Sequence, residues 1–100
     1  MVYEKLVRDL IPDMIVSQGD KPNIRILDDE EYGICLGKKL NEEVAEYHQE
    51  KNLEELADIL EVVYALAELH GGREALELTF AKKHAKRGGF SKRIYLISKE

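Results

Sequence analysis

Apolar residues recur at helical spacing in the middle of the chain, and an acidic residue interrupts them. Leu36, Leu40, Glu43 and Tyr47 are separated by four, three and four positions, so at about 100° per residue they share one helix face. We expect a helix over residues 29–50 with this face in the core. The carboxylate at position 43 therefore stands where an apolar side chain is expected, and a charge in a core usually has a partner or a function.

Three further helices are predicted from the same periodicity and from residues typical of helix ends. A proline suits the first turn of a short helix over residues 10–17. Asn52 followed by Glu55 resembles a capping box at the start of a helix over residues 53–70, and a fourth helix is expected over residues 73–86. The third helix is apolar on two sides, so it should contact two neighbours, one of which can belong to a second subunit.

Two short runs rich in β-branched residues are candidates for strands. They cover residues 24–27 and 90–97, and their pairing would make a small ribbon. The pattern predicts a single, mainly α domain over residues 1–100, a helical bundle of about four helices with a small two-stranded β ribbon. A chain of this length buries only about 60–70% of its unfolded surface, so we expect a homodimer or a homotetramer.

Four acidic residues form two three-residue steps on the second and third helices. Glu43 and Glu46 make the first step, and Glu55 and Asp58 make the second; residues three apart are neighbours on a helix surface. If the two helices pack antiparallel, these four side chains, the four-carboxylate cluster, converge. Repulsion and desolvation would force most of them to protonate unless a cation is bound. We interpret the cluster as a divalent metal site.

The types of ligand restrict the metal. Helical di-iron sites need a histidine three residues after a glutamate, but an alanine stands three residues before each of the histidines. An all-oxygen set suits Mg²⁺, with Mn²⁺ as the alternative, and such ions are usually completed by water and substrate phosphates. Glu42 and Glu61 are candidates for outer ligands, for general bases or for plain surface. Most other acidic residues on these helices should be solvated.

The net charge restricts the kinds of partner that the protein can bind. A formal net charge of −5 argues against polymeric nucleic acid and against an anionic membrane surface, because both need a basic patch. A bound phosphate group would need local cations, and the candidates are Lys5, Arg8, Lys83 and Arg87. Taken singly, such residues are more often ordinary surface. With one cysteine, no export signal and no apolar run of about 18 residues, we expect a cytoplasmic protein.

The acidic motif and both ends of the chain resemble a known family. LxEExxE over residues 40–46, followed by ExxD over residues 55–58, is similar to the signature of the MazG-like all-α nucleoside triphosphate pyrophosphohydrolases, which include phosphoribosyl-ATP pyrophosphohydrolase. KLVRDxIP over residues 5–12 and KRGGF over residues 86–90 resemble a small-protein branch of that group. The link between the two acidic motifs is short for this family.

This resemblance implies Mg²⁺ on the two central helices of an oligomeric bundle. The implied reaction is hydrolysis of a nucleoside triphosphate to the monophosphate and pyrophosphate, a possible house-cleaning role in the nucleotide pool. The four-carboxylate cluster would hold the metal that activates water, Glu42 or Glu61 would orient that water, and the candidate cations would neutralise the triphosphate. Two alternatives stay open: hydrolysis of phosphoribosyl-ATP, and a non-catalytic helical interaction module with a cation site.

Overall fold

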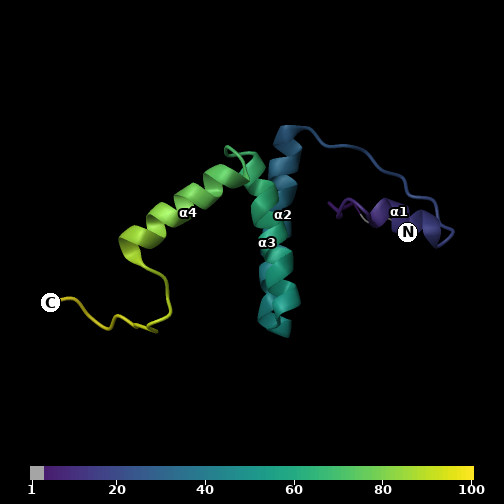
Figure 1. Cartoon of the computed structure of the whole chain (residues 1–100). Helices are drawn as coiled ribbons and strands as arrows, with labels where there is room; N and C mark the ends of the chain where they lie inside the picture. The colour runs from purple at the N-terminus through teal and green to yellow at the C-terminus, as the bar shows by residue number, and fades with distance from the viewer. Residues whose placement is uncertain (1–3) are drawn as a thin grey trace.

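Helices α2 and α3 form an antiparallel hairpin around which the rest of the chain is arranged. The computed structural model describes residues 4–100, so the first three residues of the predicted domain lie outside the described part. Its helices are α1 (Ile11–Ser17), α2 (Asp29–Glu50), α3 (Leu53–Glu68) and α4 (Arg73–Arg87). Figure 1 shows α4 leaving the end of α3 and pointing away from the hairpin. The prediction of a mainly α chain with four helices is confirmed.

Side-chain caps fix the N-terminus of each of the two long helices. The Asp28 carboxylate accepts a hydrogen bond from the Glu31 amide at 2.9 Å, and the Asn52 side chain accepts one from the Glu55 amide at 3.0 Å. Side chains of this kind at the N-cap satisfy amides that have no partner within the helix. Between the helices, Lys51 adopts a left-handed conformation with φ 50°, so the chain reverses within Lys51 and Asn52.

The core of the described chain is small and lies between α2 and α3. Its buried apolar residues are Leu36, Val62 and Ala67, and Glu43 is buried beside them. Leu40 and Tyr47, which share the Glu43 face, are half-buried. The predicted apolar stripe of α2 is therefore the face that packs on α3, and it carries its carboxylate inside.

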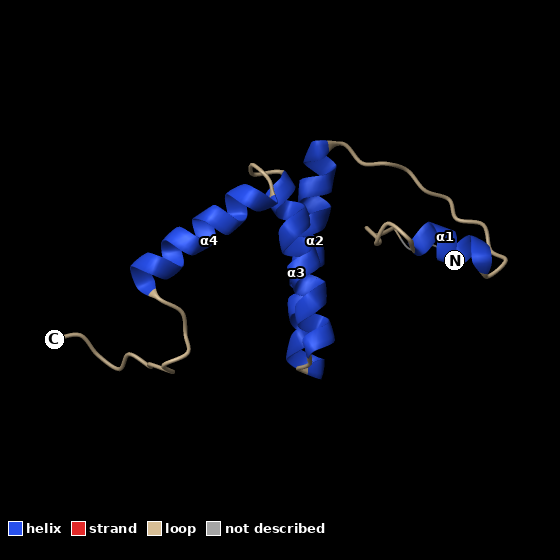
Figure 2. Ribbon diagram, viewed as in Figure 1, coloured by secondary structure: helices blue, strands red, loops and turns tan. Residues whose placement is uncertain are grey.

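The predicted β ribbon is wrong. Residues 21–28 and 88–100 contain no strand in the described chain, and Figure 2 shows both segments as irregular loops. Arg93, inside the second segment, has a φ of 58°, which interrupts an extended run. An isolated two-stranded ribbon is marginally stable in water, and Ile26 and Ile97 are exposed with no sheet to cover them.

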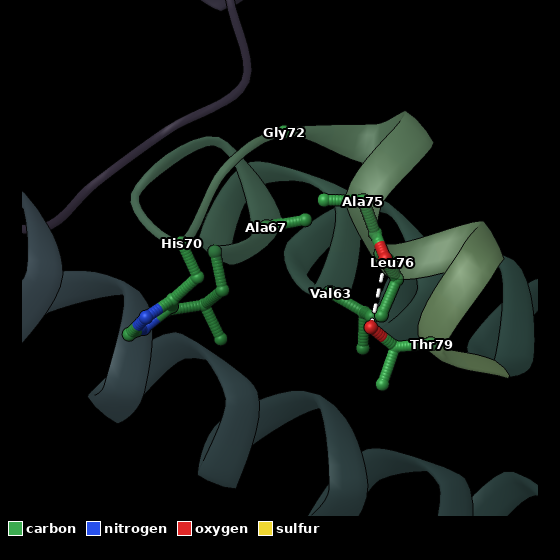
Figure 3. Close-up of a pocket in the computed structure, with 8 residues that line it drawn as sticks. Val63, Ala67, His70, Gly72, Ala75, Leu76 and Thr79 are labelled. Atoms are coloured by element: carbon green, nitrogen blue, oxygen red, sulfur yellow. Dashed lines mark hydrogen bonds between the residues drawn. The ribbon is translucent and has the colours of Figure 1, made fainter. Parts of the chain in front are cut away.

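The second apolar side of α3 is only partly covered. An open cavity of about 320 Å³ lies between the C-terminal half of α3 and α4, lined by Val63, Leu66 and Leu76 among others (Figure 3). Towards the start of α3, Leu56 and Leu60 remain 44% and 47% exposed, although Leu60 lines a second open cavity together with Leu76 and Phe80 of α4. One apolar side of α3 is thus covered by α2, and the other side is covered only in part by α4.

The N-terminal helix stands apart from the others. α1 makes no packing contact with another helix of the described chain, and Figure 1 shows it to one side of the hairpin. None of the described helices combines the length and the apolar character that crossing a bilayer requires.

Candidate metal centre

The hairpin brings the four-carboxylate cluster together. One carboxylate oxygen from each of Glu43, Glu46, Glu55 and Asp58 lies within 4.8 Å of those of the other three. The tight reversal at Lys51 places the second half of α2 beside the first half of α3. Each helix then contributes two side chains one turn apart, which point to the same side.

Glu43 is the innermost member of the cluster. The residue is only 7% exposed, and its Oε2 is shielded from solvent without a hydrogen-bond partner in the described chain. The Oε2 of Glu55 is in the same situation. A buried carboxylate oxygen without a partner is costly, so a bound cation would reduce the electrostatic cost of the fold.

Protonation is the alternative way to reduce this cost. Burial, followed by the negative charge of Glu46, raises the pKa of Glu43. Loss of solvent, again followed by the charge of Glu46, raises the pKa of Glu55. Both shifts have the direction expected when like charges crowd in a partly dry site. Glu43 and Glu55 therefore keep their protons to a higher pH than free carboxyl groups do, and a cation that binds the cluster competes with those protons.

Arg8 contacts the outer side of the cluster. Its Nη2 donates to Oδ1 of Asp58 at 2.8 Å, and its Nη1 donates to Oε1 of Glu61 at 3.3 Å. These contacts connect the N-terminal segment to α3 across about half of the sequence. Asp58 thus already has a close positive partner, whereas Glu43 and Glu55 each keep one oxygen without a hydrogen-bond partner in the described chain.

The residues present fit a small hard cation. All four side chains offer carboxylate oxygens, which Mg²⁺ and Mn²⁺ prefer. Glu43 is buried, Glu55 and Asp58 are half-buried, and Glu46 is exposed. The site is therefore closed on the hairpin side and open to solvent on the other, where water or a phosphate can reach it.

The remaining predicted site residues have different surroundings. Glu42 is exposed and lies 3.7 Å from Lys39, while Glu61 is exposed and holds Arg8. Lys5 is exposed on the N-terminal segment. These three residues therefore lie on the surface. Glu61 shares Arg8 with Asp58, and Glu42 shares Lys39 with Glu43.

Two of the candidate cations are carried away from the cluster by α4. Lys83 and Arg87 are exposed in its C-terminal half, and α4 starts from the end of α3 opposite to the cluster (Figure 1). The single chain therefore does not bring them to the carboxylates.

Lys39 is a neighbour of the cluster that the motif analysis missed. Its Nζ lies 3.7 Å from Oε2 of Glu42 and 3.7 Å from Oε1 of Glu43. The spacings of three and four residues on one helix were a local signal for both pairs. Lys39 compensates part of the Glu43 charge and lowers the pKa of Glu43 against the larger effects that raise it.

Comparison with known proteins adds little to these observations. No family model matches the chain, and no solved structure matches it. One relative, an uncharacterized protein of Mycolicibacterium smegmatis, is 55% identical over 42 residues, which are 42% of this chain and 43% of that protein. The chain thus matches less than half the length of this relative. Membership in the MazG-like family stays a prediction.

Proposed function

We propose that the protein is a Mg²⁺-dependent hydrolase that cleaves a nucleoside triphosphate to the monophosphate and pyrophosphate. The observation that carries this proposal is the four-carboxylate cluster, in which Glu43 is buried with an unpartnered oxygen. A structural cluster without a cation would place a costly charge in the small core of the hairpin.

The open side of the cluster favours phosphate chemistry. A Mg²⁺ held by a few carboxylates normally shares phosphate oxygens with its substrate, and when bound it supplies positive charge and activates water. Hydrolysis of a phosphoanhydride depends mainly on positioning and charge neutralisation. Arg8, already in contact with Asp58, is the cation best placed to meet a phosphate at this face.

The proposal that the substrate is a nucleotide rests on the sequence resemblance. The reversal at Lys51 and Asn52 leaves no loop between α2 and α3 that could frame a base. Contacts to the base would then come from the N-terminal segment or from a second subunit. Phosphoribosyl-ATP needs the same phosphate chemistry, so a substrate panel separates these two activities.

A second copy of the chain is the partner that we propose. The accessible surface is 9465 Å², whereas a compact monomer of 11.5 kDa should expose about 5,800 Å². The radius of gyration is 17.8 Å, against about 13 Å expected for 100 residues. The excess is about 3,700 Å² per chain, or about 7,400 Å² for two chains, which is more than the roughly 2,000–5,000 Å² that both partners of an obligate interface typically bury together.

The open stripe on α3 is the surface that we assign to this contact. Leu53, Leu56 and Leu60 follow each other at helical spacing and are all exposed, and Phe80 of α4 is exposed as well. An antiparallel contact between two hairpins would cover this stripe. It would also bring a second α4, with its Lys83 and Arg87, near a cluster that its own α4 does not reach.

The test is a screen for pyrophosphate release. The full-length protein is incubated with canonical and modified nucleoside triphosphates and with phosphoribosyl-ATP, in Mg²⁺ and in EDTA. We expect release from at least one nucleotide in Mg²⁺ only. Glu43→Gln should abolish it, whereas Glu50→Gln, which removes an exposed charge from the same helix, should not. If the protein hydrolyses no nucleotide in the presence of Mg²⁺, the enzyme proposal is wrong and the non-catalytic interaction module is favoured.

A further inference from the structure

Arg8 of the N-terminal segment contacts the cluster and has two acceptors there. Arg8 donates to Asp58 at 2.8 Å and to Glu61 at 3.3 Å, while α1, which follows this segment, packs on no other helix of the described chain. The contact of Arg8 with the hairpin is thus polar and lies at the site.

We propose that Arg8 is an internal counter-cation that competes with the metal for Asp58. In the metal-free protein Arg8 pairs with Asp58, and a metal ion that binds the cluster displaces Arg8 from this carboxylate. This inference rests on the proposed function only in so far as the cluster binds a metal. It concerns regulation of the site and does not depend on which substrate is cleaved.

The competition follows from charge and geometry. Asp58 is a member of the cluster and also the closest acceptor of Arg8. A divalent ion among the four carboxylates would withdraw electron density from Asp58 and repel the guanidinium. The side chains of Arg8 and Asp58 are 53% and 37% exposed, and ion pairs of such exposure are weak. Arg8 is therefore a partner that a metal ion can displace.

Once it is displaced from Asp58, the Arg8 guanidinium would be free to bind a phosphate group at the site. A guanidinium offers parallel donors that match phosphate oxygens. A phosphate group that reaches the open face together with the metal would accept Arg8 in place of Asp58. Arg8 would then exchange a protein acceptor for the ligand. Arg8 thus weakens binding of the free metal and strengthens binding of a polyphosphate that carries it.

The experiment measures the affinity of the full-length chain for Mn²⁺ alone, by calorimetry or from the paramagnetic resonance of the free ion. Arg8→Ala should tighten Mn²⁺ binding roughly two- to tenfold, the range expected on removing two exposed ion pairs. Arg25→Ala is the matched control, because Arg25 makes a similar exposed pair with Glu31, at 2.7 and 3.1 Å, outside the cluster. It removes the same charge and should leave the affinity within twofold.

A second readout follows Arg8 itself. In the parent chain, Mg²⁺ should shift the NMR signal of the Arg8 side-chain Nε–H and leave that of Arg25 in place. The Arg8→Ala variant should bind tripolyphosphate in Mg²⁺ more weakly than the parent chain does, although it binds Mn²⁺ alone more tightly. Equal Mn²⁺ affinity in the Arg8→Ala variant and the parent would overturn the competition alone. A parent chain that binds no Mn²⁺ would overturn both the competition and the proposed function.

Discussion

Lys39 and Glu43 form an ion pair that satisfies only half of a buried carboxylate. The Lys39 Nζ lies 3.7 Å from Oε1 of Glu43, one turn along α2, while Oε2 faces the cluster without a hydrogen-bond partner. A single long contact does not neutralise a carboxylate that also meets Glu46 and Asp58. The site therefore keeps an excess of negative charge directed at the point where the four side chains meet.

Mg²⁺ or Mn²⁺ should stabilise the fold because each ion binds the folded cluster and not the unfolded chain. At a concentration one hundred times Kd, linkage predicts a stabilisation of about 2.7 kcal/mol. For a domain of this size, this corresponds to a rise of roughly 10–20 °C in melting temperature. In Glu43→Gln the response should be largely lost. The same variant should be more stable than the parent in EDTA, since it removes a repelling charge. Differential scanning calorimetry measures both effects, and an unchanged metal response in this variant would place the ion elsewhere.

In EDTA the cluster should make the protein less stable as the pH rises. Glu43 and Glu55 have raised pKa values in the folded state, so between their ordinary value of 4.5 and the folded value the native protein binds more protons than the unfolded chain. Their stabilising contribution is present below that ordinary value and is lost as the pH rises through the folded one. Urea unfolding at several pH values tests this.

The comparison that isolates this contribution is between the parent and Glu43→Gln. The variant has one titrating group fewer, so its stability should fall less between acidic and neutral pH. Mg²⁺ should oppose the fall in the parent, because the ligands must lose their protons to bind metal. A steeper fall in Glu43→Gln than in the parent would contradict the raised pKa.

The features that were predictable from the sequence are those with local causes. The bounds of α2 and α3 follow from the caps at Asp28 and Asn52 and from helical periodicity. The convergence of the four carboxylates needs only one antiparallel reversal, so short-range patterns were enough. The ion pair between Lys39 and Glu43 is equally local, and its spacing of four residues on one helix could have been used to predict it.

The features that failed or were missed depend on distant parts of the chain. A strand needs a partner, and neither residues 24–27 nor residues 90–97 find one in the described chain. The contact between Arg8 and Asp58 joins residues 50 positions apart, and no periodicity encodes such a distance. The position of α4 relative to the cluster depends on the turn at Gly71 and Gly72, whose direction the pattern of apolar residues does not specify.

The open stripe of α3 should control assembly. Leu60→Glu places a charge in the middle of this stripe, so a chain that is at least a dimer should dissociate or become much less stable. Val16→Glu is the matched control, because Val16 is exposed on α1, which packs on no other helix of the described chain. Sedimentation velocity at micromolar concentration measures the species present. A monomeric parent, or a Leu60→Glu variant that associates as the parent does, would exclude this surface.

The last prediction concerns which subunit supplies Lys83 and Arg87 to the carboxylates. Asp58→Asn weakens a metal ligand and should mainly lower kcat, because activation by the metal matters most in the transition state. Arg87→Ala removes a cation that neutralises phosphate and should mainly raise KM, so at low substrate both variants should be nearly inactive. Circular dichroism checks that each is folded.

If α4 of one subunit serves the cluster of the other, co-expression of these two variants should restore activity. A mixed dimer then has one site with both defects and one intact site, formed by the Asp58 of one chain and the Arg87 of the other. With random pairing, half of the dimers are mixed, so about one quarter of all sites should be intact. If Arg87 acts on the cluster of its own chain, every site carries a defect and the mixture stays as inactive as the separate variants. Activity at limiting substrate, measured on co-purified chains with two different tags, decides between these outcomes.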